Sequence, residues 1–130
     1  MPSKRPPKVW LGDDGILRID YGQHPKIDLD AIQSAYAQHI AISTEPRPIM
    51  VLGEGAVTAT PEAEAFSNTA EVRAVTTAVA LVTGASVIGR LLAQLFLSYR
   101  HPKYPCKIFE SQAAAVEWLR QYASEESRGR

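Results

Sequence analysis

Apolar residues recur at every second position near the start of the chain, which is the spacing of a half-buried β-strand. These positions are Val9 and Leu11, followed by Leu17, Ile19 and Tyr21. The Asp14-Gly15 pair between the two runs tolerates the positive φ that a tight turn requires. The pattern therefore predicts a β-hairpin over residues 8–21.

Four later segments have helical spacing, and each begins at a residue that favours the N-cap position. The expected helices run over 29–42 after Asp28, from Thr60 to about 72, over 87–99 after Ser86, and over 112–123 after Ser111. Pro61 suits a first helical turn because no N–H is needed there. The positions expected to face inward on the first two helices are Ile32, Ala35, Tyr36, His39, Ile40, Ala63, Phe66 and Ala70.

Short apolar runs between these helices predict three further strands, over residues 48–52, 77–83 and 106–109. Strands that alternate with helices favour a parallel sheet whose strands are buried on both faces. The sequence therefore predicts an α/β fold. It has a central, mostly parallel sheet of about five strands, an N-terminal hairpin and four helices.

Composition limits the partners and the compartment. The 130 residues carry 14 basic and 14 acidic side chains, so the formal net charge is zero. Binding to nucleic acid needs a surplus of basic residues, and no such partner is expected. No apolar run reaches the ~18 residues of a transmembrane helix, so no transmembrane segment is expected. The single cysteine, Cys106, forms no intrachain disulfide and suits the reducing cytoplasm, where we expect the protein.

The ends of the chain differ from its body. Residues 1–8 are rich in proline and basic residues and are expected to form a flexible basic arm without a signal peptide. Residues 124–130 form a polar stretch that is expected to be a disordered tail. A single domain over residues 9–123 is expected between them.

Residues 78–90, AVALVTGASVIGR, resemble the glycine-rich turn of short-chain dehydrogenases, T-G-x-x-x-G-x-G. Such glycines let the backbone approach a pyrophosphate. The spacing from Gly84 to Gly89 is one residue too short, and the middle glycine is absent. An NAD-binding oxidoreductase fragment is therefore a remote alternative, and no cofactor is expected. Ser86 is a candidate anion-binding helix start, although a simple helix cap explains it better.

The order of elements and four sequence stretches carry a wider resemblance. They are W-L-x-D-D-G-I-L at residues 10–17, AVALVT at 78–83, S-V-I-G-R-L-L-A-Q-L-F-L at 86–97, and P-C-K-I-F-E-S-Q-A-A-A-V-E-W-L-R at 105–120. From about Val9 to Tyr122 the chain resembles the STAS-type domain of anti-sigma-factor antagonists, and more narrowly a bacterial group of SpoIIAA-like proteins. The resemblance implies a STAS-like domain that regulates by binding another protein, such as a kinase, a sensor or a sigma-factor regulator.

In such regulators a serine at the start of the helix after the second core strand is phosphorylated, and the phosphate decides which partner binds. The matching loop here, residues 53–61, lacks the D-S-S-G-type motif. Its only hydroxyl groups belong to Thr58 and Thr60, which are the candidate phosphorylation or switch residues. Glu62 and Glu64 would repel a phosphate, and Thr60 is explained first as a helix cap.

The segment 87–99 has a wider apolar surface than one sheet-facing stripe requires. A neighbouring helix, a second subunit, a partner protein or an apolar ligand could cover the excess. The candidate interface or pocket residues are Phe66, Leu92, Phe96, Leu97 and Tyr99, and Leu97 is expected to be exposed in an interface. A homodimer is compatible with this pattern. A lipid-binding or small apolar-ligand domain of SEC14/STAS-like architecture is the main alternative function.

The remaining reactive residues form no recognisable catalytic or metal-binding pattern. The histidines, His24, His39 and His101, lack the spacing of metal ligands, and Cys106 has no partner cysteine. No Ser-His-acid or Cys-His arrangement is recognisable. We therefore expect no metal site and a regulatory or scaffolding protein that is not an enzyme.

Overall fold

The computed structural model describes residues 6–54, 58–83 and 104–122 of the chain. A five-stranded sheet runs through this part in the order β1-β2-β4-β6-β7. Its strands are β1 (Lys8–Leu11), β2 (Leu17–Gln23), β4 (Arg47–Glu54), β6 (Thr76–Val82) and β7 (Cys106–Phe109). Only β1 is antiparallel to its neighbour, so the expected α/β fold with a mostly parallel sheet is confirmed.

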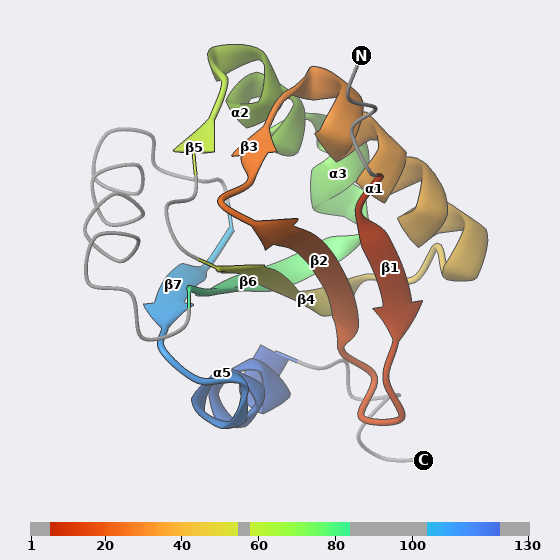
Figure 1. Cartoon of the computed structure of the whole chain (residues 1–130). Coiled ribbons are helices and arrows are strands. Elements are labelled where there is room, and N and C mark those ends of the chain that lie inside the picture. Colours follow the sequence, from red (N-terminus) through yellow and green to blue (C-terminus); the bar gives the residue numbers. More distant parts are fainter. Residues whose placement is uncertain (1–5, 55–57, 84–103, 123–130) are drawn as a thin grey trace.

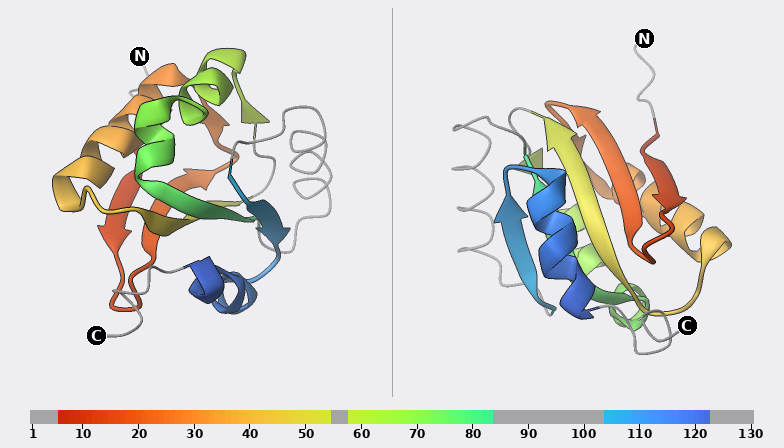
Figure 2. Two further views of the ribbon diagram at one scale, coloured as in Figure 1. Left: turned by 180° about the vertical axis from the view of Figure 1, so that it is seen from behind. Right: turned by 90° about the horizontal axis from the view of Figure 1, so that it is seen from below.

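The described residues also contain α1 (Leu29–Ile42), α2 (Pro61–Ser67), α3 (Ala70–Ala74) and α5 (Gln112–Leu119), which leads into the 3-10 turn η1 (Arg120–Tyr122). The first three helices cover one face of the sheet and α5 covers the other (Figures 1 and 2). Two-residue strands β3 (Lys26–Ile27) and β5 (Thr58–Ala59) form a separate parallel ladder beyond the carboxyl ends of β2 and β4.

The core has two layers, one on each face of the sheet. The layer beneath α5 contains Ile16, Met50, Ala78, Ala80, Val82, Ala115 and Leu119. The layer beneath α1 contains Leu17, Ile19, Ala35, Ile49 and Val79. Successive residues of a strand point to opposite faces, so β4 and β6 contribute to both layers. This explains why their sequences are continuous apolar runs.

The N-caps predicted from sequence are confirmed at Asp28, Thr60 and Ser111, whose side chains each accept a hydrogen bond from a backbone N–H in the first helical turn. The helix expected from Thr60 to 72 is instead two helices, because Thr69 caps a second one. Two inward assignments are wrong. Ala70 is exposed, and Ile40 is 38% exposed.

The first strand begins earlier than the expected domain boundary at residue 9. Pro7 is buried and Lys8 begins β1. The side chain of Gln38 donates a hydrogen bond to the carbonyl oxygen of Pro7 at 2.9 Å, which fixes the start of β1 against α1. Residues 7 and 8 are therefore part of the domain and not of a flexible arm.

Candidate functional site

The segment with the two candidate switch threonines lies where β4 ends, next to β3. In the β3–β5 ladder, Lys26 pairs with Thr58 and Ile27 with Ala59. The N–H of Thr58 donates to the Pro25 carbonyl and the N–H of Thr60 donates to the Ile27 carbonyl, each at 3.0 Å. These bonds hold the segment in one extended conformation before α2 begins.

Thr60 is engaged as a helix cap. Its hydroxyl oxygen accepts a hydrogen bond from the N–H of Ala63 at 3.1 Å, and Pro61 occupies the first turn. Glu62 and Glu64 are in the same turn. The cap interpretation of Thr60 is thus confirmed, and a phosphate on Thr60 would meet two carboxylates.

Thr58 is in a different environment from Thr60. It is exposed, and its ladder partner Lys26 is exposed as well. Paired residues of neighbouring strands are about 4.8 Å apart and point to the same face. Thr58 is therefore a hydroxyl group on a fixed backbone with an ammonium group on the neighbouring strand.

Phe66 joins two helices. Its ring meets that of Tyr36 on α1 edge-on, with the centroids 5.6 Å apart and the planes at 81°. Such edge-to-face pairs stabilise by about 1 kcal/mol beyond simple burial. Phe66 therefore ties α2 to α1 in the described part of the chain. The other predicted site residues, Ser86, Leu92, Phe96, Leu97 and Tyr99, lie outside the described residues.

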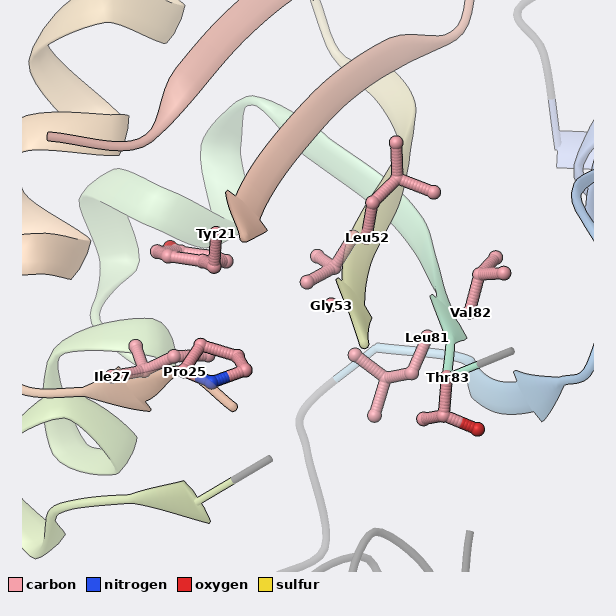
Figure 3. Close-up of a pocket in the computed structure, with 9 residues that line it drawn as sticks. Tyr21, Pro25, Ile27, Leu52, Gly53, Leu81, Val82 and Thr83 are labelled. Atoms are coloured by element: carbon pink, nitrogen blue, oxygen red, sulfur yellow. The ribbon is translucent and has the colours of Figure 1, made fainter. Parts of the chain in front are cut away.

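A small cavity of about 20 Å³ opens at the carboxyl ends of the central strands (Figure 3). Its lining is formed by Tyr21, Pro25, Ile27, Val51, Leu52, Gly53, Leu81, Val82 and Thr83. The carboxyl ends of parallel strands are where open α/β sheets usually bind ligands. This cavity has room for about one water molecule, so it gives no support to the lipid-binding alternative.

Three titratable side chains are partly buried on the face beneath α1 and α2. Burial raises the pKa of Cys106 to about 12. Burial also raises the pKa of Tyr104 to about 12, although a hydrogen bond with Ser67 opposes the rise. Burial and the neighbouring Tyr104 raise the pKa of Tyr21 as well. All three groups are neutral at pH 7, so the Cys106 thiol is a poor nucleophile there.

Among the described residues, the most deeply buried titratable side chain is that of His39 on α1. It is 2% exposed, and its Nε2 atom has no hydrogen-bond partner. Burial, and secondarily the charge of Arg47, lower the pKa of His39 to about 4. The side chain is neutral at pH 7 and belongs to the packing of α1.

Within residues 6–54, 58–83 and 104–122, no group of three or more His, Cys, Asp or Glu side chains is arranged to hold a metal ion. In the same residues, no helix is long and apolar enough to cross a membrane.

Comparison with known proteins adds one assignment. The family described as Domain of unknown function (DUF7793) matches residues 9–123. The chain belongs to this family. No curated protein and no solved structure matches the chain. The matched span of the DUF7793 domain includes the Lys26–Thr58 pair and the whole of β2, β4, β6 and β7.

One part of this candidate site could not be found from the sequence. Lys26 is brought to Thr58 by a ladder of only two residues per strand, which is too short to give an alternating pattern. The only sequence signal nearby is the Thr60-Pro61 helix start, which fixes the position of the threonines but not of their neighbour.

Proposed function

We propose that this protein is a cytoplasmic regulatory domain of STAS-like type that acts by binding another protein, without catalysis of its own. Its partner is a kinase, a sensor or a sigma-factor regulator. Phosphorylation of the segment after β4 switches which partner binds. The resemblance to anti-sigma-factor antagonists supports this function, and the environment of Thr58 supports the position of the switch.

One observation carries the proposal. Thr58 is exposed, lies on a backbone fixed by hydrogen bonds, and pairs in register with Lys26. A kinase needs an accessible hydroxyl, and a phosphate needs a cationic neighbour to form a defined charge-assisted contact. Thr58 meets both requirements within residues 53–61, the loop that the STAS-type resemblance matches to the switch.

Thr60 is the less suitable acceptor. Its hydroxyl already serves the first turn of α2, and the carboxylates of Glu62 and Glu64 are within the same turn. A phosphate on Thr60 would place more negative charge beside these two carboxylates, and the repulsion would destabilise the start of α2. We therefore assign the switch to Thr58 and the cap to Thr60.

The test is the intact mass of the protein purified from its native host, followed by localisation of any phosphate in peptides. We expect a singly phosphorylated species with the group on Thr58. Thr58→Ala should abolish it, and Thr58→Ser should retain it. Phosphate located only on Thr60, or an unmodified protein under every growth condition, would contradict the proposed switch.

A further inference from the structure

The exposed large hydrophobic side chains of the described residues belong to β1 and to the last turn of α1. They are Trp10 at 41%, Ile40 at 38% and Ile42 at 42% exposure. Trp10 is in the edge strand β1, and the two isoleucines are in the last turn of α1. In all three views the last turn of α1 and the free edge of β1 lie on the same side of the molecule (Figures 1 and 2). We call this surface the β1 flank.

The backbone along this edge offers a short set of unused hydrogen-bonding groups. The N–H of Gly12 donates to the Ile16 carbonyl, so even-numbered residues of β1 bond to β2. The N–H and C=O groups of Val9 and Leu11 therefore point away from the sheet. The ladder with β2 uses the even-numbered residues of β1, and no turn, loop or cap hydrogen bond between described residues uses the backbone groups of Val9 or Leu11.

The usable edge ends at Pro7. Proline has no N–H, and the Pro7 carbonyl already accepts from Gln38. A strand that pairs with this edge can therefore use only the groups of Val9 and Leu11. This restriction selects one register.

We propose that a second copy of this chain pairs with the β1 flank, with the two β1 strands antiparallel about a two-fold axis. This inference does not depend on the proposed switch. In the selected register, Val9 of each copy lies opposite Leu11 of the other and exchanges two hydrogen bonds with it. The contact is the same surface on both copies, as a two-fold interface requires.

Trp10 lies on the axis in this register, opposite Trp10 of the second copy. The pair is not hydrogen-bonded through its backbone, so its side chains are close, with Cα atoms about 4.5 Å apart. Trp10 shares a face with Arg18, and Arg18 is in register with the buried Met50 beneath α5. The two indole rings therefore meet on the α5 face of the joined sheet.

The opposite face of the sheet carries α1. Val9 and Leu11 pack into the layer beneath this helix. A two-fold axis perpendicular to the sheet would place the α1 helices of both copies on this same face, on either side of the axis. Trp10, on the other face of the sheet, would be covered by its counterpart at the axis and would lose contact with water.

Charge supports a second copy as the occupant. In the selected register, Lys8 of one copy lies opposite Gly12 of the other, next to Asp13. Asp14 of the same turn is already paired with Arg18, so Asp13 supplies the negative charge. Lys8 and Asp13 are both exposed. Opposite charges across paired strands stabilise the pairing, and the symmetry provides this contact twice.

The first test is disulfide trapping in the full chain. Trp10→Cys should form an intermolecular disulfide on mild oxidation, because the two Cα atoms would be within the 4.4–6.8 Å range. Lys8→Cys is the matched control on the same strand and face. Its Cα atoms would be about 13 Å apart across the axis, too far for a disulfide. Equal or slower crosslinking of Trp10→Cys would overturn the proposal.

The second test is the molar mass in solution by light scattering over a range of concentrations. The wild type should be a dimer, and Trp10→Lys should weaken dimerisation at least about tenfold, because two ammonium groups would meet on the axis. Ala113→Lys, at an exposed position on α5, should remain dimeric. A dimer unaffected by Trp10→Lys would place the interface elsewhere. A monomeric wild type would overturn the proposed dimer, and a strand from a different protein would then be the candidate partner for this edge.

Discussion

Replacement of His39 by leucine should stabilise the protein and remove most of its pH dependence between pH 8 and pH 5. The imidazole is 2% exposed, and its Nε2 atom has no hydrogen-bond partner. A buried polar atom without a partner costs about 1–3 kcal/mol. Leucine has a similar size and no polar atom, so His39→Leu should raise the free energy of unfolding by about 1 kcal/mol at pH 8.

The pH dependence follows from the shift of the His39 pKa. Burial and the charge of Arg47 lower it from 6.5 to about 4 in the folded protein. As the pH falls below 6.5, the unfolded chain takes up a proton that the folded protein still excludes, so stability is lost until the pH reaches about 4. The loss from pH 8 to pH 5 is about 2 kcal/mol, approaching about 3 kcal/mol at lower pH.

The assay is urea unfolding at about pH 8, 7, 6 and 5 for the wild type, His39→Leu and a control at His24. His24 is exposed with a φ of 45°, so His24→Asn removes a histidine while keeping a residue that tolerates this conformation. The control should show the wild-type decline towards pH 5. A flat wild-type profile, or an unchanged slope in His39→Leu, would refute the argument from burial.

Three other predictions follow from local contacts. Thr60→Ala should lower the free energy of unfolding by about 1 kcal/mol, whereas Thr60→Asp should keep the cap and the stability. An equal loss of stability in both variants would contradict the capping role. Asp14→Ala should destabilise the first hairpin by about 1–2 kcal/mol, because Asp14 bonds to the Ile16 N–H and pairs with Arg18. Arg18 also lowers the pKa of Asp14 in the folded protein. The stabilisation by Asp14 should therefore be present above pH 3.8 and be lost below it. Unfolding of the wild type and Asp14→Ala at pH 7 and pH 2.5 would test this. Cys106 should react with a thiol reagent at pH 8 at least about a hundredfold faster in denaturant than in the native protein, because burial raises its pKa to about 12.

The sequence was sufficient for elements whose side chains repeat with a clear period. The alternation around Asp14-Gly15 predicted the hairpin, and the apolar runs predicted β4, β6 and β7 to within a few residues. Cap residues such as Asp28 and Ser111 predicted where helices begin, since an N-cap acts on its own helix and needs no distant partner.

Features that depend on few residues or on distant neighbours were missed. The interruption between α2 and α3 falls at Ser67-Asn68-Thr69, three residues that compete with helical hydrogen bonding, and this signal was available in the sequence. The exposure of Ile40 could not be predicted, because helical spacing does not show how far the sheet extends beneath a helix.

In the candidate site, too, the sequence predicted the local contact and missed the contact between distant residues. Thr60 could be assigned as a cap from sequence because its partner, the N–H of Ala63, is three residues away. Lys26 could not be linked to Thr58, because their contact depends on how β3 and β5 meet in three dimensions. The sequence therefore located the two threonines, and the structure distinguished them by their surroundings.

The most direct test of the proposed function is comparative affinity capture from the native host with wild-type, Thr58→Ala and Thr58→Glu proteins as baits, read by quantitative mass spectrometry. We expect a regulatory protein recovered in near-equal amount with one of the two variants and at least about tenfold less with the other, because charge at Thr58 selects the partner. Identical sets of captured proteins for all three baits would contradict a partner switch at Thr58.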